Sequence, residues 1–187
     1  HLGVLRQFLS HKKYEKALQY LDELYAPVQG LRATVWTGDE TVDYLINEKA
    51  ARSKAGGIDL KVQVEFPRCT NLRSADLCAI LGNLLDNALE AAGQVKEPGK
   101  RFVRLIIRRI NQMLVIKVEN SCAFRPVMEN GLPKTTKENN GLHGWGLKSV
   151  QTAAEKYDGM VQTSYADCLF RTVVTLSYEG IPVEGKA

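Results

Sequence analysis

The sequence lacks the features of a chain that is embedded in a membrane, cross-linked by disulfides or bound to nucleic acid. No apolar run approaches the roughly 20 residues that a membrane helix needs, and no charged-then-apolar leader is visible. The four cysteines show no C-x-x-C spacing, so we expect neither a zinc site nor a disulfide framework, and interpret the thiols as reduced in a cytosolic environment. The net charge of +4 is small and the basic residues are dispersed, which argues against nucleic acid.

What the sequence does have is enough apolar content for one substantial core and a small appendage. It contains 187 residues, of which 44% are hydrophobic. The chain starts at His1 rather than Met, so we interpret it as a fragment. A membrane anchor is expected only in a missing upstream part.

Residues 1–36 are predicted to form a helical hairpin and a linker. Apolar residues recur at helical spacing over 2–9 and again over 14–25, with a polar turn at 10–13 between them. Two short amphipathic helices cannot bury both apolar faces internally, so the hairpin is expected to pack against a second copy of itself. The alternative is an ordinary helical pair packed on the main domain.

Residues 37–187 are predicted to form a second, α+β domain. A possible capping box at 37–40 starts a helix that Gly56 and Gly57 end. The element order that follows indicates a two-layer α/β sandwich. The remaining expected elements are a strand over 58–66, a helix over 74–92, hairpin strands over 101–110 and 113–120, a loop over 125–140, a helix over 147–157, and strands over 160–165 and 169–177.

One face of the helix over 74–92 is rich in side-chain oxygens. Asn83, Asp86, Asn87 and Glu90 are spaced by three and four residues, opposite an apolar face. Such a set can direct several oxygens at one ion and suits Mg²⁺, which takes one or two protein ligands beside nucleotide phosphates. The alternative is a solvated helix face.

Two further stretches suit a nucleotide. Glycines over 141–146 lead directly into a helix, where backbone N–H groups favour a phosphate, although such connections are also common for conformational reasons. His143 either touches the phosphate or caps the helix. Asn120 ends an apolar strand and is placed to hydrogen-bond a base edge.

Together these stretches resemble a known superfamily. Asn-Leu-Leu-Asp-Asn-Ala at 83–88 resembles the N box of GHKL ATP-binding domains, and His-Gly-Trp-Gly-Leu-Lys-Ser-Val at 143–150 resembles their second glycine box. The runs 37–55 and 131–137 look like the subfamily of peptide-pheromone (quorum-sensing) receptor kinases and related sensor kinases. The resemblance covers nearly the whole chain and implies the Bergerat-type ATP-binding fold.

The resemblance also implies roles for individual residues, with ATP and Mg²⁺ as cofactors. Asn87 would be the Mg²⁺ ligand, and the residues 125–140 would form a lid over ATP. The residues implied to contact the nucleotide are Asn83, Asn87, Asn120, Lys137, His143, Gly144, Gly146 and Leu147.

Two departures from the family pattern bear on function. The first glycine box, usually Asp-x-Gly-x-Gly, is replaced by Asn120-Ser121-Cys122, whose first carboxamide can still accept the adenine amino hydrogen bond. His1-Leu2 matches the last two residues of a phosphoacceptor motif that resembles His-Asp-x-x-Asn-His-Leu. The acceptor histidine would then lie five residues upstream of this chain.

The residue at Asn83 favours phosphoryl transfer over hydrolysis. GHKL ATPases that hydrolyse ATP place a Glu base at this position, and an amide cannot deprotonate water. A neutral imidazole can attack the phosphorus through the lone pair of its unprotonated nitrogen, so it needs no general base. We therefore expect the catalytic domain of a two-component sensor histidine kinase, a homodimer through its N-terminal helices that passes phosphate to a response regulator.

The alternatives are a non-enzymatic, nucleotide-gated interaction module, which a degenerate kinase would be, and an anti-sigma-factor serine kinase, against which the N-terminal hairpin argues. Arginines at 101, 104, 108 and 109 are interpreted either as a basic docking patch or as the solvent face of a strand pair.

Overall fold

The computed structural model describes residues 2–17, 20, 34–68, 70–125, 128–129, 132–133 and 146–180. It divides the chain into two compact units, residues 1–32 and 33–187. In the first unit, helix α1 (Leu2–Ser10) ends in a turn where Lys12 has a φ of 54°, and residues 14–17 are again helical. The rings of Phe8 and Tyr20 meet edge to face at 6.0 Å. The described residues therefore run helix, turn, helix as predicted, whereas dimerisation stays a prediction.

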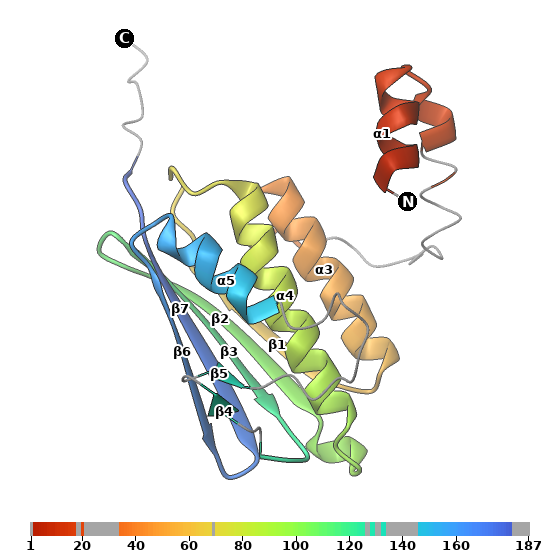
Figure 1. Cartoon of the computed structure of the whole chain (residues 1–187). Helices are drawn as coiled ribbons and strands as arrows, with labels where there is room; N and C mark the ends of the chain where they lie inside the picture. Colours follow the sequence, from red (N-terminus) through yellow and green to blue (C-terminus); the bar gives the residue numbers. More distant parts are fainter. Residues whose placement is uncertain are drawn as a thin grey trace. The chain divides into compact units, whose positions relative to one another are not determined.

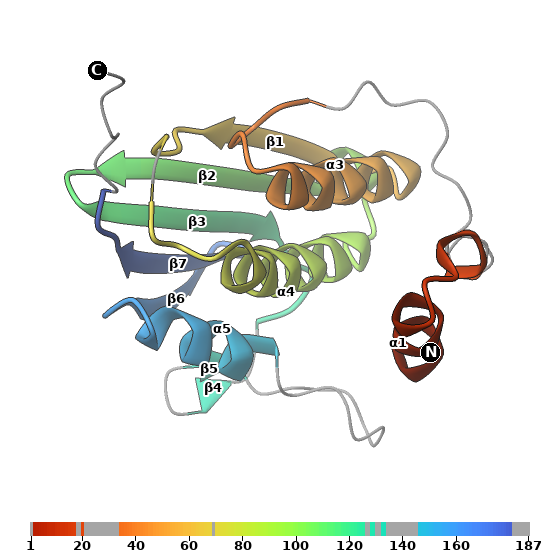
Figure 2. The same cartoon turned by 90° about the horizontal axis from the view of Figure 1, so that it is seen from above.

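The second unit is a two-layer sandwich of helices on one face of a mixed sheet, as predicted (Figure 1). The strand order is β1-β2-β3-β7-β6, with β1 parallel to β2 and every other pair antiparallel. Seen from above, α3, α4 and α5 lie over the same face (Figure 2). The elements are α3 (Glu40–Ala55), β1 (Asp59–Val64), α4 (Ser74–Gly93), the 3-10 helix η1 (Pro98–Lys100), β2 (Phe102–Ile110), β3 (Met113–Ser121), β4 (Met128–Glu129), β5 (Leu132–Pro133), α5 (Gly146–Glu155), β6 (Met160–Ala166) and β7 (Leu169–Ser177).

The core lies between the sheet and the helices. Alternate residues of β2 and β3 point toward the helices, because successive side chains of a strand face opposite sides. Val103, Leu105 and Ile107 on β2 are at most 1% exposed, and Ile80 and Leu85 of α4 are fully buried against this layer. The apolar stripe of α4 is therefore the face that packs on the sheet, which leaves its carboxamide-bearing face for other contacts.

Two details differ from the sequence predictions. The N-cap of α3 is Asp39, whose carboxylate accepts hydrogen bonds from the N–H groups of Thr41 and Val42. The box predicted from Thr37 is wrong, because the Thr37 hydroxyl and N–H both donate to Asp43 instead. Inside the stretch predicted as a loop, β4 and β5 form a short antiparallel pair.

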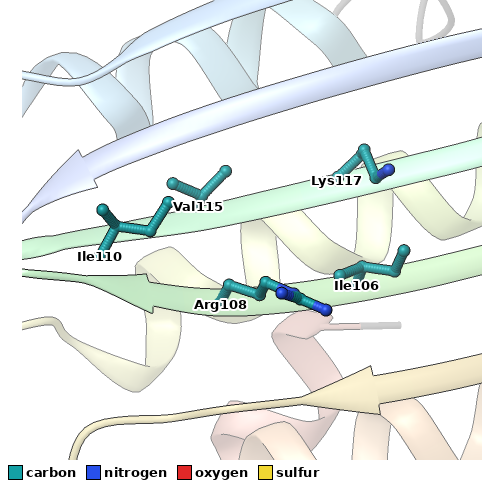
Figure 3. Close-up of a pocket in the computed structure, with 5 residues that line it drawn as sticks. All are labelled: Ile106, Arg108, Ile110, Val115 and Lys117. Carbon is teal, nitrogen blue, oxygen red and sulfur yellow. The ribbon is translucent and has the colours of Figure 1, made fainter.

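The face of the sheet opposite the helices carries a shallow groove of about 310 Å³ in the part of the chain that the structure describes. Ile106, Arg108 and Ile110 of β2 line it together with Val115 and Lys117 of β3 (Figure 3). Arg104 also points to this face and lies 4.0 Å from the buried Glu119 carboxylate. These arginines match the interpretation as a solvent face of a strand pair. Arg101, which precedes β2, instead donates to the Val95 carbonyl.

No helix among the described residues is long and apolar enough to cross a membrane.

Candidate nucleotide-binding site

The structure brings two of the predicted site segments together. Gly146 opens α5 directly beside the polar face of α4, and a Cβ atom added to Gly146 would lie 3.2 Å from Asn83 Oδ1 and 3.6 Å from Asn87 Nδ2. Asn83 Nδ2 donates to the Ala79 carbonyl at 2.7 Å, which orients the Asn83 oxygen toward Gly146. Asn87 is exposed. The first turn of α5 thus lies beside two carboxamides that precede it by at least 59 positions in the sequence.

Asp86, which helical spacing places in one oxygen-rich set with Asn83 and Asn87, does not join this group. Its carboxylate faces α3, where Oδ1 lies 2.6 Å from Arg52 Nη1 and 3.0 Å from Lys49 Nζ. Lys49 is only 7% exposed and also pairs with Glu48. Asp86 therefore ties α4 to α3, and the carboxamides face α5 without this carboxylate between them.

Asn120 lies at the end of β3 on the helix-covered face. It is 3% exposed, and its Nδ2 donates to the Ser121 carbonyl at 3.0 Å. Val118 precedes it in the same core-facing row and is 2% exposed. A carboxamide fixed in this way at the edge of the core suits recognition of a flat polar edge, because apolar walls surround a single oriented polar group.

Of the other predicted site residues, the structure describes only Leu147. Leu147 follows Gly146, and its side chain packs partly buried against the core. Lys137, His143 and Gly144 lie outside the described residues, as does most of the predicted lid. The described residues contain no group of three or more His, Cys, Asp or Glu side chains able to hold a metal.

This donor set still fits Mg²⁺ bound together with phosphates, because that ion needs only one or two protein oxygens. Asn87 offers one carboxamide oxygen and is open to solvent beside the start of α5.

An ion pair between the buried Asp76 and the half-exposed Lys156 fixes the far end of α5 to the start of α4. The Asp76 carboxylate accepts hydrogen bonds from Lys156 Nζ at 2.6 Å and from the Tyr157 hydroxyl at 2.8 Å. The Tyr157 oxygen in turn accepts from the Arg73 N–H at 3.0 Å. The hydrogen bond from Lys156 lowers the pKa of Asp76, outweighing its burial, and the bond from Tyr157 adds to this. The network holds α5 in the position that places Gly146 beside Asn83.

We expect Asp76→Asn to lower the free energy of unfolding by about 1–3 kcal/mol at neutral pH, because it removes a buried charged hydrogen-bond acceptor. The native pKa of Asp76 lies below its usual 3.8, so its stabilisation is present above that value and is lost as pH falls through the native pKa. Urea unfolding at pH 7 and at pH 2.5 measures both effects. The difference in the free energy of unfolding between wild type and Asp76→Asn should be smaller at pH 2.5 than at pH 7.

Asp59→Asn is the matched control, because Asp59 pairs with Lys61 at 3.7 Å on a surface where its side chain is 64% exposed. Ion pairs on the surface contribute little to the free energy of unfolding. If Asp76→Asn lowers the free energy of unfolding no more than Asp59→Asn does, Asp76 does not anchor α5 to α4.

Comparison with known proteins identifies the family of the chain. The model of the GHKL domain family matches residues 72–177, which include α4, β2, β3 and α5. The chain belongs to the GHKL domain family. A probable C4-dicarboxylate sensor kinase from Halalkalibacterium halodurans is 27% identical over 159 residues, covering 79% of this chain. This chain spans 29% of that relative's length.

Solved structures share the fold. The catalytic domain of histidine kinase ThkA superposes with a TM-score of 0.54 at 16% identity, covering 79% of this chain and 97% of that one. Acinetobacter baumannii histidine kinase AdeS gives 0.52 at 15% identity over 94% of each chain. Full-length ShkA in complex with AMPPNP gives 0.55 at 14% identity, over 83% of this chain and 33% of that one. The fold is that of histidine kinase catalytic domains.

Sequence reasoning missed the partners of Asp76 and Asp86. Asp86 pairs with cations on α3, and Asp76 pairs with Lys156 in the turn after α5, 80 positions away. A single sequence gives no signal for such pairs, because spacing along one helix identifies a face and not what packs against it.

Proposed function

We propose that this chain is the ATP-binding catalytic domain of a two-component sensor histidine kinase, which transfers the γ-phosphoryl group of MgATP to a histidine. The observation that carries the proposal is the meeting of Asn83 and Asn87 with Gly146 at the first turn of α5. Family membership supports it, and so does a curated relative described as a sensor kinase.

In the proposed site each residue has a distinct task. The backbone N–H groups at the start of α5 receive phosphate oxygens, because a helix N-terminus favours an anion. Lys137, His143 and Gly144 are proposed to add phosphate contacts, and Asn120 to accept the adenine amino hydrogen. Asn87 would hold Mg²⁺, which when bound neutralises phosphate charge.

Asn83 supports transfer to a histidine rather than to water. Its amide nitrogen donates to the Ala79 carbonyl, and no amide acts as a base toward water. In the proposed transfer, an imidazole nitrogen lone pair forms a bond to the γ-phosphorus while the bond to the bridging oxygen breaks and ADP leaves. Positioning that imidazole in line is then the main requirement.

The wider assignments rest on the same proposal. The partner that receives the phosphoryl group is proposed to be a response regulator, and residues 1–36 to belong to a dimerisation hairpin. The acceptor histidine and any membrane anchor are proposed to lie in the longer protein. The runs 37–55 and 131–137 support the peptide-pheromone receptor subfamily.

Phosphoryl transfer in trans tests the function. We expect the chain alone to bind ATP but to incorporate label from γ-labelled ATP at close to background. Addition of a helical segment with the His-Asp-x-x-Asn-His-Leu motif should produce acid-labile label on that segment, because the acceptor imidazole is then available.

The same segment with its first motif histidine changed to glutamine is the matched control and should remain unlabelled. Acid-labile label on the chain alone would place the acceptor at His1 or His11 instead. Nucleotide binding without transfer in either case would favour the non-enzymatic, nucleotide-gated module.

A further inference from the structure

Two cysteines lie opposite each other where β3 ends and β7 begins, and Cys122 is two positions beyond Asn120. Ser121 pairs with Leu169 in the ladder, so the next step brings Cys122 opposite Cys168. The Cys122 N–H donates to the Cys168 carbonyl at 2.9 Å, and Cys122 Sγ lies 3.4 Å from the same oxygen. Residues opposite each other across an antiparallel ladder have Cα atoms about 4.5–5.5 Å apart. That separation falls within the roughly 4.4–6.8 Å that a disulfide requires.

Both side chains lie on the same side of the sheet. Alternation along β3 places Cys122 on the helix-covered face with Asn120 and Val118. Phe170 of β7 pairs with Asn120 of β3 on one side and with Tyr165 of β6 on the other. The Tyr165 hydroxyl lies 3.9 Å from Cys168 Sγ. Both cysteines therefore lie on the helix-covered side of the sheet, beside the proposed adenine contact.

The turn that carries Cys168 does not by itself account for a cysteine there. Asp167 and Cys168 form the two-residue connection between β6 and β7 with φ values of 50° and 58°. Such turns favour glycine at the second position, because a side chain at positive φ is strained. A thiol at this position thus points to chemistry rather than to turn formation.

We propose that Cys122 and Cys168 form a reversible thiol–disulfide site, oxidised by hydroperoxides such as hydrogen peroxide. The exposed Cys168 sulfur attacks one peroxide oxygen, the O–O bond breaks, and water leaves after proton uptake, so that Cys168 becomes a sulfenic acid. The Cys122 sulfur then forms a bond to the Cys168 sulfur, the S–O bond breaks, and the leaving hydroxide takes up the Cys122 proton as water. Two thiols and one peroxide thus give one disulfide and two waters.

The order of the two steps follows from burial. Cys122 is 7% exposed, and burial raises the pKa of its thiol, with the neighbouring Cys168 adding to the effect. Cys168 is exposed and meets a dissolved oxidant first. Cys122 resolves the sulfenic acid from the opposite strand, and its exclusion from solvent protects it from independent oxidation.

Disulfide formation should lower nucleotide affinity, a consequence that rests on the proposed function. To reach Cys168 Sγ, the Cys122 thiol must give up its contact with the Cys168 carbonyl, and the new S–S bond then ties the end of β3 to the turn before β7. Asn120 is oriented by the carbonyl of Ser121, the residue between Asn120 and Cys122. We therefore expect the cross-link to act on the proposed adenine contact through the Ser121 carbonyl.

The test is oxidation of the full chain with hydrogen peroxide, followed by alkylation and peptide mass mapping. We expect a linked Cys122–Cys168 peptide pair, lighter by about two hydrogens than the reduced pair and restored by dithiothreitol. Cys168→Ser and Cys122→Ser should each abolish the link. Cys78→Ser on α4 is the matched control and should leave the link unchanged.

A link to any other cysteine, or over-oxidation of Cys168 without a link in folded protein, would overturn the site. Cys168→Ser alters only an exposed side chain, so its result stands even where Cys122→Ser fails to fold. Calorimetric titration with ADP adds the second readout. A link with unchanged ADP affinity would overturn the effect on binding, whereas reduced wild type that binds no ADP would instead contradict the proposed function.

Discussion

Asn87→Ala should abolish binding of MgATP while the domain stays folded. Asn87 is exposed on α4 beside Gly146, so its truncation removes a polar group at the site without opening a cavity in the core. Mg²⁺ takes only one or two protein ligands next to phosphates, so the loss of one removes much of the protein's share of its coordination. We expect calorimetry to show an affinity at least about 100-fold weaker, which corresponds to roughly 2.7 kcal/mol.

Two comparisons make this result specific. Gln94→Ala removes an exposed carboxamide at the C-terminal end of the same helix and should leave the affinity unchanged. Titration without Mg²⁺ should bring wild type close to the variant, because the missing interaction passes through the ion. Undiminished affinity of Asn87→Ala with Mg²⁺ present would show that Asn87 is not the ligand.

The element order was predictable because each main element carries its own local signal. The helical period places α4, and alternating apolar residues place β2 and β3, with Asn111 and Gln112 as the connecting turn. Asn111 has a φ of 53°, a conformation that asparagine adopts more readily than most residues. The fold prediction succeeded since periodicity and turn chemistry do not depend on distant parts of the chain.

The site was predictable only as far as the family resemblance and one helical face allowed. Asp86 shares the polar face of α4 with Asn83 and Asn87 by spacing, yet Lys49 and Arg52 on α3 attract its carboxylate away from them. Pattern alone treated these polar residues as equivalent. The partners on α3 and α5 then separate them into a helix-joining carboxylate and two carboxamides at the candidate site.

Gly146→Ala should weaken nucleotide binding without lowering stability, which separates the site from the fold. Alanine is a better helix former than glycine, so the change at the first residue of α5 does not disfavour the helix. Its Cβ would nevertheless lie 3.2 Å from Asn83 Oδ1, a contact that Asn83 must relieve by moving. Asn83 also donates to the Ala79 carbonyl, so a small movement of its side chain changes the direction of its oxygen at the site while the hydrogen bond is kept.

We expect Gly146→Ala to bind MgATP about tenfold more weakly, equivalent to roughly 1.4 kcal/mol, and Gly146→Val to bind more weakly still. Gly82→Ala is the matched control, because its Cβ on α4 would meet Leu45 at an ordinary 4.0 Å, so binding should persist. Measurements of ATP affinity and of thermal unfolding on the same variants separate a role of Gly146 in binding from a role in packing. If Gly146→Val binds like wild type, the start of α5 is not where phosphates lie; if affinity falls only together with unfolding, the glycine serves packing. A loss of affinity in a stable Gly146→Ala domain would point to a ligand at the junction of α4 and α5, because the nearest atoms to the added methyl group among the described residues belong to Asn83 and Asn87.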